Sequence, residues 1–321
     1  MKAMIYQAYG SPDEIEIKDV PKPAPKAGEA LVEVRAASVN LADWEMLTGT
    51  PLYARIWGLS RPRYETLGSD VAGRVEAVGE GVTRLKPGDE VFGDIMGSFG
   101  AFAEHVCAPA DVLMPKPSGM TFEDAAALPQ AGAIARCGIC EEGKVREGQN
   151  VLINGAGGGS GMFAIQAAKS LGAIVTGVDN AEKQAFMRSV GADRVVDYTR
   201  EDFARSGDRY DLILDLVAHR SIFDHLHVLA PGGRYLLVGG SMARLFQCLL
   251  VGPPLSLLGG KKLGLLAVRP MHESFESFRA LLDAGTLEPV IDRRYPLGEV
   301  ADALRYVGEG HALGKVVITM G

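Results

Sequence analysis

The chain has 321 residues, of which 47% are hydrophobic and 23% are charged, and its formal net charge is −7. This length and composition allow two domains with a sizeable core and exclude a disordered chain. The acidic balance contains no basic run longer than a pair such as Lys261-Lys262. We therefore expect neither nucleic acid nor a membrane surface as a partner.

The beginning of the chain and its cysteines predict a cytoplasmic protein. Residues 1–8 lack the apolar segment of a signal peptide, and the most apolar region, residues 245–268, is interrupted by Pro253-Pro254, glycines and two lysines. The cysteines lack the pattern of a disulfide framework and fit a reducing compartment: Cys107, Cys137, Cys140 and Cys248.

The first part of the chain alternates short β patterns with turns. Strands are expected at Ala30–Ala36, Val71–Val78 and Ala101–Val106, because apolar residues recur there between turn residues. A partly closed β domain is therefore predicted. At Thr121–Asp124 a pattern typical of a helix N-terminus begins, and we place the domain boundary there.

Beyond that boundary, apolar strands alternate with helical runs. This pattern predicts a doubly wound α/β domain, in which helices cover both faces of a parallel sheet. The tail is expected to add helices at Glu273–Ala284 and near Gly298–Gly308, and a last strand, Lys315–Thr319, that returns to one of the two sheets. The parallel strands are expected at Val151–Asn154, Ile174–Val178, Arg194–Asp197, Asp211–Asp215 and Gly233–Val238.

A glycine turn, residues 155–161, connects the first of these strands to an amphipathic helix. Glycines let the backbone turn tightly and approach a ligand, and the free N–H groups at the helix N-terminus favour a phosphate. The literal G-x-G-x-x-G is missing, so a tight turn of another kind is the alternative. The strand and helix around it favour a dinucleotide site, with Gly157, Gly158, Gly159, Ser160 and Gly161 as its predicted residues.

An acidic residue, Asp179, ends the second of these strands. A carboxylate about 20 residues beyond the first glycines accepts hydrogen bonds from the adenosine ribose and disfavours a 2′-phosphate. NADH is therefore predicted over NADPH. Lys183 would serve a 2′-phosphate if Asp179 pointed away, which leaves NADPH as the alternative.

Three features together resemble the medium-chain dehydrogenase/reductase superfamily, and specifically its zinc-independent quinone oxidoreductase-like branch, over essentially the whole chain. They are Leu67–Gly79 with Pro87–Gly93, the glycine turn, and Gly314–Ile318. The turn in that family commonly reads G-A-x-G-G-V-G, and here Ser160 replaces the valine. The resemblance implies a GroES-like catalytic domain and a Rossmann-type cofactor domain, at 1–122 with 270–321 and at 123–269.

The zinc alcohol dehydrogenases of this superfamily hold their metal with a cysteine, a Gly-His-Glu motif and a later cysteine. The matching segments, Ser38–Asp43 and Gly68–Asp70, offer neither thiolate nor imidazole, and Met96–Gly100 lacks a four-cysteine lobe. Cys137-x-x-Cys140 is open to interpretation as a metal or redox pair, but two thiols do not fill a tetrahedral site, and helix packing is favoured. No zinc is expected.

The resemblance implies hydride transfer from a nicotinamide to a quinone, an enone or an enoyl thioester, with hydrogen-bond donors at the developing oxyanion. Asn40 matches the asparagine of the family's V-N-x-x-D segment and is expected near the nicotinamide and the substrate carbonyl, while Asp43 orders that loop. The alternative for Asn40 is a side chain that stabilises a turn. Tyr53 is the candidate proton donor or carbonyl ligand, and a packed phenol with an exposed hydroxyl is its alternative.

Other positions bear on the cofactor and the substrate. Tyr198 matches a position that often borders the adenosine, and Val238 and Gly239 complete the expected cofactor site. Ile134 stands where relatives often place a threonine, so a hydroxyl near the nicotinamide is lost. The apolar region 245–268 is interpreted as pocket wall, subunit contact or ordinary core.

The leading hypothesis is an NAD(P)H-dependent reductase of an activated C=C bond or a quinone, acting on a small molecule such as an acyl thioester or a lipophilic enone. An alcohol dehydrogenase is the first alternative. A non-catalytic nucleotide-sensing or RNA-binding protein is the second, and the acidic charge counts against RNA. The resemblance also implies a homodimer. One fold supports many substrates, so the acceptor stays open.

Overall fold

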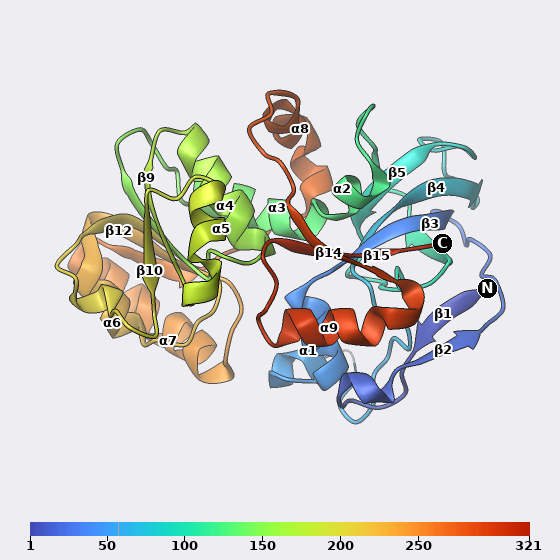
Figure 1. The fold of residues 1–321 in the computed structure, drawn as a ribbon, viewed down its shortest axis with the longest axis horizontal. Helices are drawn as coiled ribbons and strands as arrows, with labels where there is room; N and C mark the ends of the chain where they lie inside the picture. The colour runs from blue at the N-terminus through green and yellow to red at the C-terminus, as the bar shows by residue number, and fades with distance from the viewer. Residues whose placement is uncertain (57) are drawn as a thin grey trace. The chain divides into compact units, whose positions relative to one another are not determined.

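The computed structural model describes residues 1–56 and 58–321. They form two compact units, and each chain terminus belongs to unit 1 (Figure 1). Unit 1 comprises Met1–Gln130, Pro270–Ser277 and Pro289–Gly321, and unit 2 comprises Ala131–Arg269 and Phe278–Glu288.

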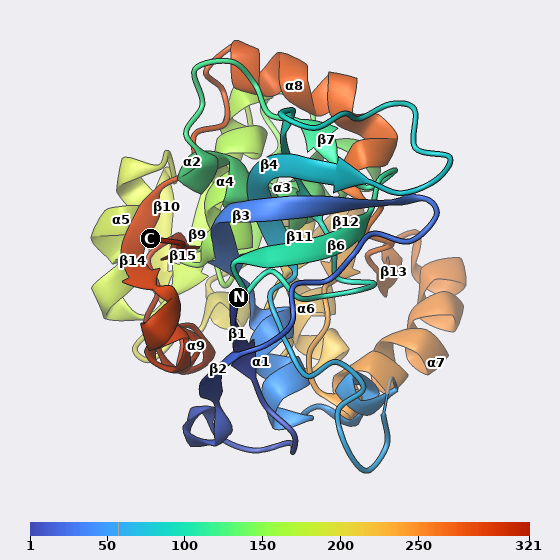
Figure 2. The same cartoon turned by 90° about the vertical axis from the view of Figure 1, so that its right-hand side faces the viewer.

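Unit 1 is built on a seven-stranded sheet. Its longest strand, β3 (Glu29–Val39), pairs with β4 (Asp70–Val78) and with β6 (His105–Pro109), and Figure 2 shows β3 between these two. The predicted return of the tail is confirmed, because β15 pairs with β3. The remaining strands are β5 (Glu90–Asp94), β7 (Met114–Pro115), β14 (Ile291–Pro296) and β15 (Lys315–Thr319), and a separate pair is formed by β1 (Lys2–Ile5) and β2 (Glu16–Asp19).

One strand of unit 1 begins later than predicted. β6 starts at His105, whereas the expected strand was Ala101–Val106, and Ala103 forms only an isolated bridge with Ala3. The reason is local: Phe99 and Gly100 both have positive φ, at 54° and 109°, so the chain is still turning just before this segment.

Short helices pack on the unit 1 sheet. Thr121 Oγ1 accepts a hydrogen bond from the Asp124 amide at 3.0 Å, which confirms the predicted helix start. Gly308 lies against the Trp44 ring so closely that a Cβ there would overlap it. The helical segments are α1 (Leu41–Thr48), α2 (Phe122–Ala126), α9 (Val300–Gly308) and the single turns Pro12–Glu14, Leu52–Arg55, Met271–Ser274 and Leu297–Glu299.

Unit 2 is a six-stranded parallel sheet in the order β10-β9-β8-β11-β12-β13. Because β8 comes first in the chain, this is the 3-2-1-4-5-6 order of dinucleotide-binding domains. The five predicted strands are confirmed, and a sixth, short and lysine-led, was not predicted. The bounds are β8 (Asn150–Asn154), β9 (Ile174–Asp179), β10 (Arg194–Asp197), β11 (Tyr210–Asp215), β12 (Leu229–Leu237) and β13 (Lys262–Leu265).

The apolar region 245–268 forms most of one helix and the added strand. Cys248 of α7 is buried and Leu245 packs against the same core, while Phe246 and Leu250 are exposed. Across the described ranges, no helix is both long and apolar enough to cross a membrane. The remaining helical segments are α3 (Pro129–Ala135), the π-helical turn Arg136–Glu141, α4 (Gly159–Ser170), α5 (Gln184–Ser189), α6 (Ile222–Val228), α7 (Met242–Gly259) and α8 (Phe275–Asp283), with 3-10 turns at Ala181–Lys183 and Phe203–Arg205.

Candidate active site

The glycine turn of unit 2 has the geometry of a phosphate cradle. Gly155 takes a φ of 85° and its amide donates to Val178 O of the neighbouring strand at 2.9 Å. A Cβ at Gly161 would collide with the Gly155 carbonyl oxygen, so only glycine lets α4 approach the turn this closely. Gly158 is the N-cap of α4, and N–H groups of the first helical turn are free to bind an anion. These residues fit a dinucleotide pyrophosphate.

Asp179, at the end of β9, faces this turn. Its Oδ2 accepts a hydrogen bond from the Gly157 amide at 3.0 Å, and its Oδ1 lies 3.8 Å from Lys183 Nζ. The Lys183 side chain is buried and covers Gly157, where a Cβ would meet it. Tyr198 is 54% exposed, and its amide donates to the Asp179 carbonyl at 3.2 Å. The structure thus brings four of the predicted cofactor residues together.

A buried carboxylate, Asp215 at the end of β11, was not predicted. Its Oδ1 accepts from Asn154 Nδ2 at 2.8 Å and from the Ala218 amide at 2.9 Å, and its Oδ2 accepts from Tyr235 Oη at 2.9 Å. Burial opposes ionisation, but the neighbouring His225 and these donors lower the Asp215 pKa to about 2. The carboxylate therefore ties the strand before the glycine turn to the loop after β11. An acid directly after an apolar strand was the signal available in the sequence.

The two remaining predicted cofactor residues follow β12. The Val238 amide donates to the Asp215 carbonyl at 2.9 Å, and Gly239 takes a φ of 65°. Gly240 also has positive φ, and a Cβ there would overlap the Ala218 side chain. The turn after β12 thus packs on the loop that Asp215 holds.

In unit 1, Asn40 follows β3 directly and is 7% exposed. Its side chain belongs to the capping box at the start of α1 and also reaches other segments: Nδ2 donates to Asp70 Oδ2 at 2.8 Å and to Ser69 Oγ at 3.0 Å, and Oδ1 accepts from Lys315 Nζ at 2.5 Å. Asp43 Oδ2 accepts from the Asn40 amide at 2.8 Å. Lys315 was not singled out by the sequence analysis, because only the pairing of β15 with β3 brings it here.

Asn40, Lys315 and the acids Asp43, Asp70 and Asp94 form what we call the Asn40 corner. Its acids are hard to ionise. Burial, and then the charge of Asp70, raise the pKa of Asp43 to about 7. Burial raises the pKa of Asp70 as well, and Lys315 opposes that rise. Asp94 faces Asp70 across the β4–β5 pair, and burial and Asp70 raise its pKa to about 7. These acids therefore ionise at a higher pH than exposed aspartates do.

Tyr53 belongs to a short 3-10 turn after α1 and is half-buried. Its hydroxyl donates to Glu45 Oε1 at 2.8 Å, and burial raises the pKa of Glu45. The Tyr53 hydroxyl is therefore held in place by the Glu45 side chain. Glu45 is a second acid that the sequence analysis did not identify, because nothing in the chain order pairs it with a residue eight positions later.

The residues at the Asn40 corner do not fit a zinc ion. They are an amide, a hydroxyl, carboxylates and an ammonium, and a cation already lies among them. No three His, Cys, Asp or Glu side chains of residues 1–56 and 58–321 are grouped so that they could hold a metal. The pair Cys137 and Cys140 lies in the π-helical turn as two free thiols.

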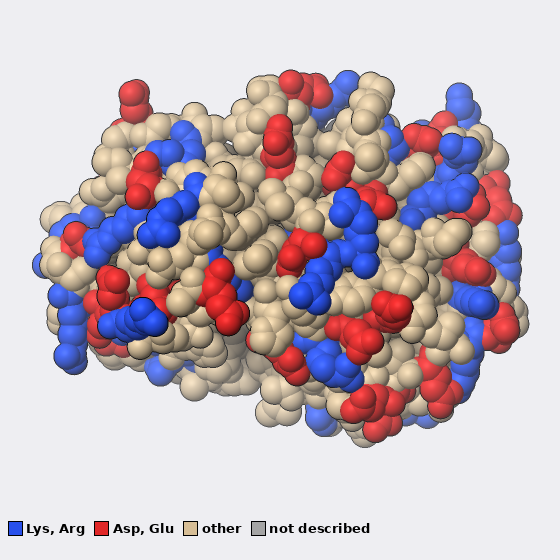
Figure 3. All heavy atoms as spheres, in the orientation of Figure 1, with Lys and Arg blue, Asp and Glu red and all other residues tan. Residues whose placement is uncertain are grey.

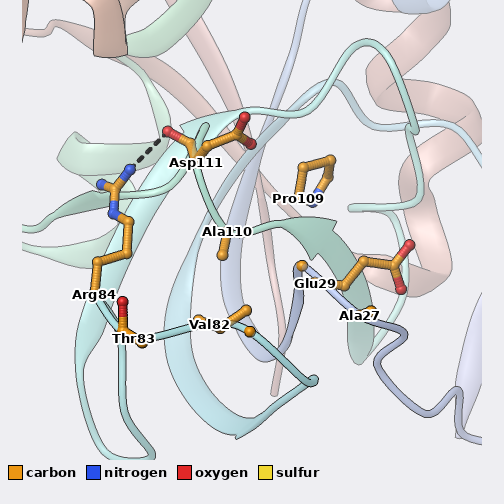
Figure 4. A pocket seen from close by; sticks show the side chains of 10 residues that line it. Ala27, Glu29, Val82, Thr83, Arg84, Pro109, Ala110 and Asp111 are labelled. Carbon is orange, nitrogen blue, oxygen red and sulfur yellow. Dashed lines mark hydrogen bonds between the residues drawn. The ribbon is translucent and has the colours of Figure 1, made fainter.

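A surface hollow of about 550 Å³ lies elsewhere in unit 1 (Figure 4). It is lined by residues 27–29, 81–84 and 109–111, and Arg84 Nη1 donates to the Asp111 carbonyl at 2.9 Å. Glu29 begins β3 and Asn40 follows its end, so the hollow and Asn40 lie at opposite ends of this strand. The hollow is therefore distinct from the Asn40 corner.

The fold and the glycine turn define a two-unit protein of the dinucleotide-binding class. Residues 26–118 match the family described as alcohol dehydrogenase GroES-like domain, and residues 190–318 match the family described as zinc-binding dehydrogenase. The chain is 32% identical over 330 residues to a 2-methylene-furan-3-one reductase of Solanum lycopersicum, and the alignment covers 99% of this chain and 79% of the relative.

Two further proteins are similar over nearly the whole chain. An Arabidopsis thaliana protein named NADPH-dependent alkenal/one oxidoreductase, chloroplastic, is 30% identical, with 99% of this chain and 79% of the relative covered. The structure of a quinone oxidoreductase from Coxiella burnetii has a TM-score of 0.88 at 27% identity, with 99% of each chain covered. The chain belongs to the medium-chain dehydrogenase/reductase superfamily, in its quinone oxidoreductase-like branch, as the sequence motifs predicted.

The raised pKa of Asp94 predicts a pH-dependent stability. In the unfolded chain this acid ionises near pH 4, whereas in the fold it stays protonated to about pH 7, so its contribution to the free energy of unfolding falls between these pH values and is flat above them. Asp94→Asn keeps an acceptor for the Met96 amide and should gain stability over the wild type as the pH rises from 5 to 7. We expect on the order of 1 kcal/mol, since Asp94 is partly exposed.

The measurement is urea unfolding of both proteins at pH 5, 6, 7 and 8. Glu14→Gln, at an exposed carboxyl group of the same unit, is the matched control and should track the wild type. A difference between Asp94→Asn and wild type that is the same at every pH would contradict the prediction.

Proposed function

We propose that the protein is an NAD(P)H-dependent reductase that works without a metal on an activated C=C bond, such as an enone or enoyl thioester, or on a quinone. The observation that carries the proposal is the Asn40 corner, where Lys315 and an amide stand and no metal ligand set exists among the described residues. The glycine turn supports the cofactor. The names of the relatives, a furanone reductase, an alkenal/one oxidoreductase and a quinone oxidoreductase, support the acceptor class.

The chemistry suits a site without a Lewis acid. The bound nicotinamide cofactor supplies a hydride to one carbon of the acceptor. Negative charge then develops on the acceptor oxygen, and donors placed there lower the barrier. A proton completes the reduction, so one hydride and one proton add across the double bond. A simple aldehyde, in contrast, gains more from a metal that polarises its carbonyl.

Tyr53 is proposed as the proton donor. Its hydroxyl is oriented by Glu45 Oε1, which accepts from it at 2.8 Å. Asn40 is proposed to hold the substrate side of the site in its fixed orientation. The two residues belong to unit 1, which is the proposed catalytic domain.

NADH is proposed as the preferred cofactor because the Asp179 carboxylate already faces the glycine turn. Lys183, Tyr198, Val238 and Gly239 are proposed to border the dinucleotide. The NADPH in the name of the Arabidopsis relative belongs to that protein, and Lys183 is the residue here that would favour the same cofactor.

A homodimer and a cytoplasmic location are part of the proposal. Exposed apolar side chains on α7, including Phe246 and Leu250, support a subunit contact. Figure 3 shows acidic and basic side chains interspersed on the visible face, which supports a small molecule over nucleic acid as the partner. The reducing-compartment pattern of the cysteines supports the cytoplasm.

The proposal is tested by steady-state oxidation of NADH and NADPH in EDTA against a quinone, an enone, an enoyl-CoA and a simple aldehyde. Turnover of at least one of the first three acceptors, unchanged by EDTA, is expected. Turnover of the aldehyde alone, or only after zinc is added, would make the alcohol dehydrogenase alternative correct. Nucleotide binding without any turnover would favour the sensing alternative.

Removing the Tyr53 hydroxyl should slow the reduction. Tyr53→Phe is expected to lower kcat for the double-bond acceptor about 100-fold, since a positioned general acid contributes that order of rate. Tyr64→Phe is the matched control, because the Tyr64 hydroxyl also bonds a neighbour, Gly97 O at 2.7 Å, in the same unit. A Tyr53→Phe kcat within twofold of wild type would rule out this proton donor.

Changing Asp179 should alter the cofactor preference. Asp179→Ser removes the carboxylate that repels a 2′-phosphate and releases Lys183 to bind it, so the ratio of kcat/KM for NADPH over NADH should rise at least about tenfold. Glu182→Ser, at an exposed acid of the same loop, is the control and should leave the ratio near that of wild type. A wild-type enzyme that already prefers NADPH would show that the Asp179 interpretation is wrong.

A further inference from the structure

Lys315, the first residue of β15, is a buried cation. It is 2% exposed, and its Nζ lies 2.5 Å from Asn40 Oδ1 and 3.8 Å from Asp70 Oδ2. β15 lies next to β3 (Figure 1). Their antiparallel pairing aligns Val316 with Val39, which brings Lys315 beside Asn40. The cation therefore reaches this corner through strand register alone.

The Asn40 amide can satisfy its neighbours in only one orientation. Its Nδ2 has two hydrogens, which go to Asp70 Oδ2 and Ser69 Oγ, and its Oδ1 accepts from Lys315. A rotation of the amide by 180° would place Oδ1 against the Asp70 carboxylate and Nδ2 against the ammonium. Lys315 and Asp70 together thus select one of the two orientations.

Four titratable groups face one another here. Asp70 is nearest to Lys315, and the charges of Asp43 and Asp94 also act on it. Burial lowers the pKa of Lys315, and these three acids oppose that effect. The charge of Lys315 in turn lowers the pKa of Asp70 and of Asp94. Lys315 is therefore a cation within a cluster of three acids.

We propose that Lys315 is a positioning residue of the reductase site, which holds the Asn40 amide in a single orientation through its hydrogen bond to Oδ1. The inference rests on the function proposed above. Lys315 is almost fully buried and its Nζ donates to Asn40 Oδ1, so it acts through that residue. Without the ammonium, only Ser69 and Asp70 hold the amide, at Nδ2, and the orientation of Asn40 is less strongly restricted.

The test compares Lys315→Met with wild type and with Lys22→Met, a control at an exposed lysine that pairs with Glu76. We expect Lys315→Met to lower kcat at least about tenfold, with the dissociation constant for the cofactor, followed by its fluorescence, within twofold of wild type. That split is expected because Asp179 and the glycine turn belong to unit 2, whereas Lys315 belongs to unit 1.

The pH dependence of kcat/KM separates a positioning role of Lys315 from a role in stability alone. Without the Lys315 charge, the pKa values of Asp70 and Asp94 rise, so the acidic limb of kcat/KM should move to higher pH. Lost folding alone would scale the whole profile down without moving it. Lys22→Met should leave both the height and the position of the profile unchanged.

Two further variants keep the test decisive if Lys315→Met folds poorly. In Lys315→Met/Asp70→Asn neither buried charge remains unpaired, so the melting temperature should recover while kcat stays low. Lys315→Arg retains a charged donor and should keep more of the kcat than Lys315→Met. Wild-type-like kcat and pH profile in the folded double variant would overturn the inference and leave the proposed function standing. A wild type without turnover of any acceptor would overturn the proposed function, and this inference with it.

Discussion

The Lys315 ammonium lies buried among carboxylates, 3.8 Å from Asp70 Oδ2. A buried charge costs several kcal/mol unless opposite charges and hydrogen bonds surround it. Here the partners come from three strand segments that are far apart in the chain: Asn40 after β3, Asp70 at the start of β4 and Lys315 at the start of β15. The C-terminal strand must therefore return to this sheet before the corner is electrostatically complete, which couples closure of unit 1 to assembly of the candidate site.

Both units use a carboxylate as a clamp on backbone N–H groups. In unit 1, Asp43 accepts from the amides of Asn40 and Gly68 at 2.8 and 3.2 Å. In unit 2, Asp179 accepts from Gly157 and Asp215 accepts from Ala218. In each case the acid stands near a strand end and holds the loop that carries the proposed ligand contacts. The Asp215 pKa of about 2 keeps that acceptor charged, and a charged acceptor makes a stronger hydrogen bond than a neutral one, so the loop after β11 is held firmly.

The same electrostatics bears on the proposed reaction. A metal ion polarises a carbonyl strongly, whereas the Asn40 corner offers an amide held by an ammonium and acids that keep their protons to about pH 7. The reduction proposed above needs no metal, because hydride addition to a double bond conjugated to an oxygen places the developing charge on that oxygen, where hydrogen-bond donors can stabilise it. The branch of the superfamily and the names of its members are in keeping with that chemistry.

Local patterns in the sequence determined the strand–turn–helix around residues 155–161, the helix start at Thr121 and the five central strands of unit 2, because each depends on residues adjacent in the chain. Short motifs of a few residues each also identified the family. Tertiary structure alone decided that Lys315 meets Asn40 and that Glu45 meets Tyr53. It also decided that Asp215 joins the strand before the glycine turn to the loop after β11. These pairings depend on strand register, on a turn that folds back on its helix and on loop packing. The energy of a buried charge is set by neighbours that chain order does not reveal.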